Sequence, residues 1–119
     1  MKMKMIKEPV FESYCRVIWD CTQEELKDYL IKEFNYETSI KNGSHAKFIE
    51  IDNGPESWLE WIIWTKDFDI MEFLHEITHL IFNIMKFKGI PICQETEEVF
   101  IHLQIYYVRQ IKGLTRRVK

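Results

Sequence analysis

The sequence has few of the residues that define several common classes of protein. Three of its 119 residues are cysteines, Cys15, Cys21 and Cys93, an odd number without a Cys-x-x-Cys pair. We therefore expect neither a disulfide framework nor a cysteine-based zinc site. We expect the protein to be in a reducing compartment. Glycine and proline are also sparse, with four and three residues, and no repeat or low-complexity tract occurs.

Long apolar runs and a strong excess of one charge are missing as well. The longest apolar run near the middle, residues 61–64, is far too short to cross a bilayer. The lysine-rich N-terminus is followed by no apolar stretch, which is unlike a signal peptide. The formal net charge is −3, with both signs mixed along the chain, so neither nucleic acid nor a membrane is an expected partner. We expect a soluble, cytoplasmic protein.

Apolar residues, in contrast, are plentiful. They make up 46% of the chain, and 14% of the residues are aromatic. This is enough for the core of one domain, and the length leaves no room for a second. We expect residues 1–119 to form one domain, with residues 1–8 and 113–119 as flexible tails because basic residues gather at both ends.

The first half of the chain shows strand, helix, strand and strand. Residues 10–19 are rich in aromatic and β-branched residues and predict a strand. Thr22 and Glu25 form a capping box that opens a helix. Turns at 42–44 and 53–55 then bound two segments, 46–51 and 58–64, which should pair as an antiparallel hairpin. The buried stripe of the helix should hold Leu26, Tyr29, Leu30 and Phe34.

Two helices follow. Asp69 is a cap with Glu72 three residues on, and the helix it opens should end near Phe87, before Gly89. The last helix should run from about Gln94 to about Ile111. These elements predict an α+β fold with an antiparallel sheet packed on helices.

The segment His75-Glu76-Ile77-Thr78-His79 carries the chemistry. Histidines four residues apart lie on one face of a helix, one turn from each other, where both can reach one tetrahedral Zn²⁺. In metalloproteases with this HExxH pattern, the glutamate takes a proton from the metal-bound water. The apolar residues of this helix fall on the opposite arc, which argues against two histidines buried in the core. The alternative that the histidines only belong to a solvated polar face stays open.

A third ligand is expected from the next helix. Glu95, Glu97 and Glu98 follow His79 by 16 to 19 residues. Glu98 lies deepest in the helix and one turn before His102, so we predict Glu98 as the ligand and His102 as its hydrogen-bonding partner. Compensation of the helix dipole is the alternative role for all three acids.

The stretch 58–111 resembles small zincin-like proteins of phages and prophages. Its matching parts are the aromatic strand at 61–64, the HExxH helix and the helix that opens with Glu97 and Glu98. The resemblance, which extends to minimal gluzincins, implies a zincin-like zinc fold with a glutamate as third ligand. It also implies a phage origin, and hence a host cytoplasm or a virion. His102 stands where that family commonly has tyrosine.

Two functions compete. In the first, a zinc-dependent metallopeptidase, Glu76 is the general base, and strand 58–64 lines the cleft and holds a peptide substrate. Tyr106 and Tyr107 are candidate donors to an oxyanion, with core packing as their alternative role. In the second, the chain is a non-catalytic zinc-binding structural or assembly protein of a phage, with virion partners and tryptophans at a partner surface. A regulator of a DNA-binding domain is less favoured. Substrate and oligomeric state stay open.

Overall fold

The helix caps lie where the sequence predicts them in the computed structural model, which describes residues 1–52 and 59–118 and no side chain beyond residue 114. Helix α1 (Gln23–Phe34) begins with the capping box of Thr22 and Glu25, and ends at Asn35 in the left-handed region (φ 51°). Helix α2 (Ile70–Phe87) begins at Asp69, whose carboxylate accepts from the amides of Met71 and Glu72. The two predicted helix starts and the predicted end of α2 at Phe87 are confirmed.

The last helix differs from its predicted limits at both ends. Residues Gln94–Thr96 form a 3₁₀ turn, η1, and helix α3 runs over Glu97–Val118. The buried stripe of α3 continues past Ile111 to Leu114, which is only 5% exposed. Burial of Leu114 supports the helix beyond Ile111, and the predicted C-terminal tail is corrected because residues 113–118 are helical.

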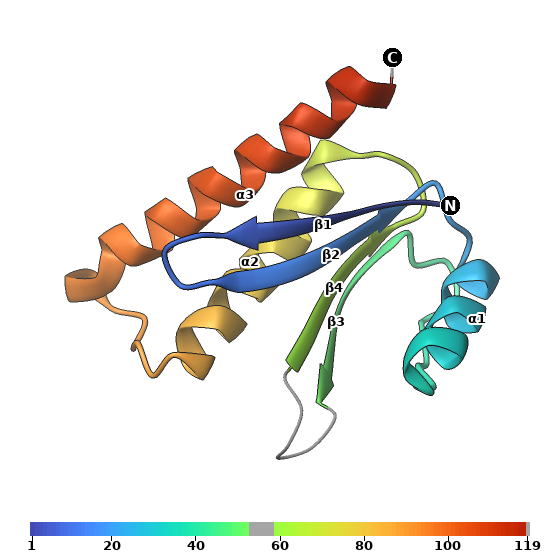
Figure 1. Cartoon of the computed structure of the whole chain (residues 1–119), viewed down its shortest axis with the longest axis horizontal. Helices are drawn as coiled ribbons and strands as arrows, with labels where there is room; N and C mark the ends of the chain where they lie inside the picture. Colours follow the sequence, from blue (N-terminus) through green and yellow to red (C-terminus); the bar gives the residue numbers. More distant parts are fainter. Residues whose placement is uncertain (53–58, 119) are drawn as a thin grey trace.

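Within the described residues, four strands form one mixed sheet in the order β1-β2-β4-β3 (Figure 1). They are β1 (Lys2–Glu8), β2 (Ser13–Trp19), β3 (Ala46–Asp52) and β4 (Leu59–Thr65). The antiparallel pairing of β3 with β4 is confirmed. The predicted turn at 53–55 and the strand start at Trp58 lie outside the described residues.

Strand β1 corrects the prediction of a flexible N-terminal tail. It pairs antiparallel with β2 along its whole length, from Lys2 opposite Trp19 to Glu8 opposite Ser13. Its lysines suit an edge strand, since charged side chains keep a free edge from pairing with other chains. Only Ile6 and Glu8 of this strand are buried, so most of its side chains, Met3 and Met5 included, are exposed.

The sheet is mixed rather than antiparallel, because β2 and β4 run parallel. Helix α1 connects β2 to β3, which forms the far edge of the sheet. The chain then turns back, and β4 lies between β2 and β3. Strand β2 begins at Ser13 rather than at residue 10, because residues 9–12 form the turn of the β1–β2 hairpin.

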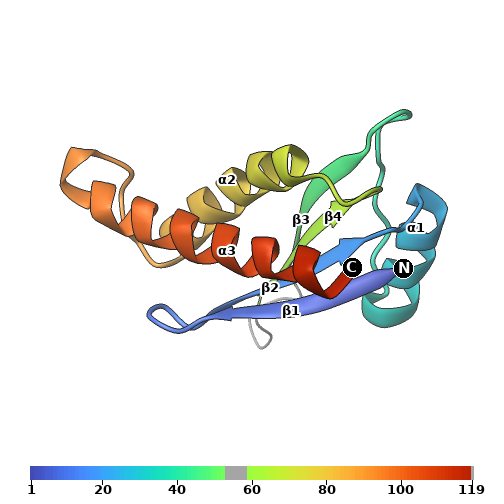
Figure 2. The ribbon, with the colours of Figure 1, turned by 90° about the horizontal axis from the view of Figure 1, so that it is seen from above.

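The helices cover both faces of the sheet. Helices α2 and α3 pack side by side on one face, where Phe73, Ile77 and Tyr107 meet Val17 and Ile63 (Figure 2). Helix α1 covers the other face through Leu26 and Leu30. Within the described residues, no helix is long and apolar enough to cross a membrane. The packing of α2 on the sheet thus anchors the helix that carries the HExxH segment through its buried inner side.

Candidate metal centre

His75 and His79 project from the outer side of α2, as the periodicity predicts. Both are exposed, and 70% of the His75 side chain is accessible. Their Nε2 atoms are 3.3 Å apart, and their ring centroids are 5.0 Å apart. One helical turn thus brings two ring nitrogens to a single point outside the helix.

Glu76 is buried beside this pair, only 7% exposed, at the contact between α2 and the edge strand β3. Its carboxylate accepts a hydrogen bond from the backbone N–H of Phe48. The Phe48 ring in turn stacks on His79, with 6.5 Å between centroids and 25° between planes. Glu76 Oε1 lies 3.9 Å from His75 Nε2. Burial raises the pKa of Glu76, against the opposing effect of the two histidines.

The histidine pair has the geometry of two zinc ligands. Two nitrogens at about 2.0–2.1 Å from a tetrahedral ion are separated by about 3.3–3.4 Å. The Nε2–Nε2 distance of 3.3 Å agrees with that separation, although two imidazoles that share a proton come equally close. The two imidazoles therefore have a geometry suited to bind a zinc ion, and the adjacent carboxylate of Glu76 is suited to accept a proton.

The three acids around the start of α3 do not form a metal-binding cluster with the two histidines. Glu95, Glu97 and Glu98 are exposed, and no cluster of three or more His, Cys, Asp or Glu side chains suited to a metal occurs in residues 1–52 and 59–114. Glu98 as a ligand therefore stays a prediction from sequence.

If the side chains keep the arrangement of the structure when zinc binds, Glu98→Ala should change zinc affinity no more than Glu95→Ala does, because both side chains are exposed and apart from the histidines. Competition titrations with a chromophoric zinc chelator on the two variants would measure this. A loss of affinity confined to Glu98→Ala would instead establish Glu98 as the third ligand, as its spacing predicts.

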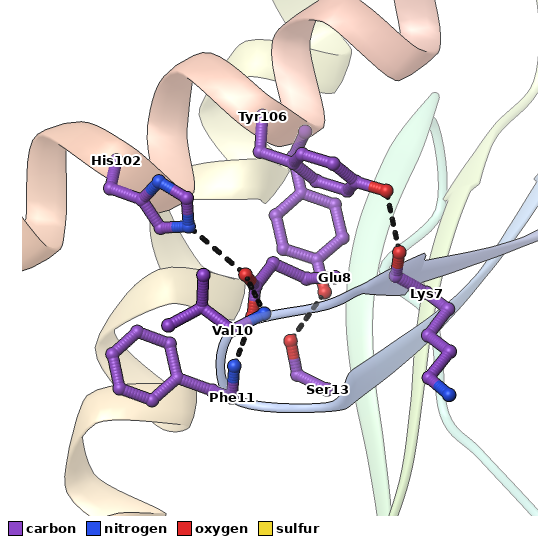
Figure 3. Close-up of polar contacts among 8 residues, drawn as sticks. Lys7, Glu8, Val10, Phe11, Ser13, His102 and Tyr106 are labelled. Atoms are coloured by element: carbon purple, nitrogen blue, oxygen red, sulfur yellow. Dashed lines mark hydrogen bonds and ion pairs between the residues drawn. The ribbon is translucent and has the colours of Figure 1, made fainter.

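His102 contacts a different acid from the one predicted. Its Nε2 lies 3.0 Å from Oε1 of Glu8 at the end of β1 (Figure 3). Glu8 has no exposed surface and also accepts from the amides of Val10 (2.7 Å) and Phe11 (2.8 Å). The predicted partnership of His102 with Glu98 is corrected, since His102 ties α3 to the β1–β2 turn instead.

The two tyrosines of α3 also face this hairpin. Tyr106 donates to the carbonyl of Lys7 at 2.6 Å, and the buried Tyr107 hydroxyl lies 2.8 Å from Oγ of Ser13. Burial raises the pKa of Tyr107 far above its usual range. Both hydroxyls are thus occupied by structural contacts, which agrees with the packing role and not with the oxyanion role.

Over Ile62–Trp64, strand β4 has no free edge for the predicted addition of a peptide strand, because β2 and β3 pair with it on either side there. The strand edge nearest the histidines belongs to β3, through Phe48.

Three tryptophans, Trp19, Trp61 and Trp64, are buried, so they form no partner surface. The sequence does not predict the roles of Phe48 and Glu8, because the side chains that they contact are remote in the chain.

Comparisons with known proteins give no relative for this chain: no protein-family model, no curated protein and no solved structure matches it.

Proposed function

We propose that this chain is a zincin-like, zinc-dependent metallopeptidase. The observation that carries the proposal is the convergence of the His75 and His79 Nε2 atoms beside the buried carboxylate of Glu76. When bound, zinc polarises a substrate carbonyl and lowers the pKa of a water to about 7. His75 and His79 would hold the ion, and Glu76 would accept a proton from the attacking water and pass it to the leaving amine.

The surroundings of Glu76 suit a proton acceptor. Its raised pKa brings the carboxyl group closer to the working range of a general base, because burial disfavours the charged form. The amide of Phe48 fixes its orientation through a hydrogen bond. Glu76 therefore is positioned by β3 and not by the metal, and it remains free for proton transfer.

A peptide is the favoured substrate because of the edge strand. Strand β3 pairs with β4 on one side only, and its Phe48 touches both Glu76 and His79. An extended peptide can add to such an edge through those main-chain groups that are not already bonded to Glu76, with a scissile bond near the histidines. The free edge of β3 supports proteins or peptides as substrates.

Zinc content tests the proposal. Purified protein should bind about one zinc ion per chain, and His79→Ala should lose it, because one imidazole cannot hold the ion alone. Native mass spectrometry gives the stoichiometry, and added zinc should raise the Tm of the wild type but not of the variant. His45 is an exposed histidine outside the pair, so His45→Ala is the matched control and should behave as wild type. Wild-type protein that refuses added zinc would refute the metal site.

A non-catalytic zinc protein is the second candidate. The observation that favours it is the lack of a third ligand beside His75 and His79 in the described part of the chain. Such a protein, with virion or assembly proteins as partners, needs the histidines but not the carboxylate. Substitution of Glu76 therefore separates the two functions.

A further inference from the structure

Strand β3 forms one edge of the sheet (Figure 1), and its residue Phe48 contacts the candidate metal centre in two ways. The backbone N–H of Phe48 donates to the carboxylate of Glu76. The ring of Phe48 stacks on the imidazole of His79, with 6.5 Å between the centroids and 25° between the planes. One residue of the edge strand therefore contacts both the candidate base and a candidate metal ligand.

The ring of Phe48 favours one orientation of the His79 side chain. Phe48 is partly buried and packs against the core cluster beneath α2, so its own ring is held in place. A separation of 6.5 Å is within the range of favourable ring pairs. In the rotamer that Phe48 contacts, Nε2 of His79 lies 3.3 Å from Nε2 of His75, which is the arrangement suited to zinc.

His79 gains from such support because it is exposed. An exposed side chain loses rotamer freedom when it binds a ligand, and this loss weakens binding. A neighbouring ring that already favours the binding rotamer reduces the loss. The contact with Phe48 should therefore increase the zinc affinity of the histidine pair.

We infer that Phe48 is a positioning residue that couples zinc binding at His75 and His79 to the order of strand β3. The inference rests on the proposed zinc site. Coupling between two equilibria is reciprocal, so a ring that favours the zinc-binding rotamer of His79 is itself favoured by bound zinc. Zinc thus firms the strand edge proposed to receive the peptide, and metal loading regulates that edge.

Substitutions of Phe48 test the effect of its ring on zinc affinity. Phe48→Leu removes the ring but keeps an apolar side chain and the backbone N–H that binds Glu76. We expect zinc affinity to fall about threefold to tenfold, the effect of one lost aromatic pair. Phe48→Tyr restores a ring and should stay within about twofold of wild type. Competition titrations with a chromophoric zinc chelator measure all three proteins.

Phe68→Leu is the matched control. Phe68 is also partly buried and packs against the same core cluster, where its ring contacts Trp19 and Phe73, the latter on α2. The same substitution there removes ring contacts that do not involve the histidines, and zinc affinity should stay within about twofold of wild type. Equal losses in Phe68→Leu and Phe48→Leu would mean a general loosening of the core and would overturn the inference.

Amide hydrogen exchange tests the reciprocal effect on the strand. In the wild type, zinc should slow the exchange of amides 47–50 by about threefold or more, and by less in Phe48→Leu. Amides of β1, the other edge strand, should slow less than those of β3. Equal slowing of both strands, or of β3 in both proteins, would show that zinc does not act through Phe48.

The two levels of the proposal fail in different ways. Wild-type protein that binds zinc, with unchanged affinity in Phe48→Leu, would overturn the role of Phe48 and leave the metal site intact. Wild-type protein that binds no zinc would overturn both.

Discussion

Replacement of Glu76 by glutamine should abolish peptide hydrolysis while zinc stays bound. Glutamine has nearly the same shape and keeps an oxygen that can accept from the Phe48 amide, so α2 and β3 stay in register. It cannot take a proton from water, and loss of a general base costs about a hundredfold or more in rate. Turnover of a quenched-fluorescence peptide library, with metal content measured on the same samples, gives both quantities.

The matched control is Glu72→Gln, one turn earlier on α2. Glu72 is only partly buried and lies in the first turn, where its backbone amide is capped by Asp69. We expect its rate to stay within about twofold of wild type, since the charge of Glu72 is the smallest of the effects on the pKa of Glu76. Equal function of Glu76→Gln and wild type, together with failure of His75→Ala, would identify the protein as a zinc scaffold without peptidase activity.

Local signals explain what could be predicted. The capping residues Thr22 and Asp69 act on amides two or three residues away, so helix starts can be read from adjacent letters. The histidine pair depends only on helical spacing, and its exposed face follows from the apolar arc of α2. These parts of the fold and of the site need no information from remote segments.

Remote contacts explain what could not be predicted. Glu8 and His102 are 94 positions apart, and neither has a neighbour in sequence that points to the other. Helical spacing points instead to Glu98, four residues before His102. The parallel pairing of β2 with β4 depends on where α1 delivers the chain, which strand patterns alone do not encode. The burial of Glu76 similarly depends on β3, which the sequence separates from α2.

Glu8→Ala should lower the free energy of unfolding by about 3 kcal/mol. Glu8 is fully buried and joins three donors: the amides of Val10 and Phe11 and the ring of His102. Hydrogen bonds to a buried charge are worth about 1.5–3 kcal/mol, and removal of the acceptor leaves the buried parts of its donors unsatisfied. Denaturant unfolding followed by tryptophan fluorescence measures the change. Glu12→Gln, exposed in the same turn, should stay within about 0.5 kcal/mol of wild type.

The same carboxylate makes stability depend on pH. Burial acts to raise the pKa of Glu8, but the hydrogen bonds from His102, Phe11 and Val10 outweigh it, and the pKa falls below its usual value of 4.5. A lowered folded-state pKa means that the unfolded chain binds the proton more readily. The contribution of Glu8 is therefore complete above about pH 4.5 and is lost as the pH falls through the lower folded-state pKa. Glu8→Gln should show a flatter loss of unfolding free energy than wild type between about pH 5 and pH 3. Parallel curves for the two proteins in that range would show that the Glu8 charge adds nothing to the attachment of α3 to the β1–β2 turn.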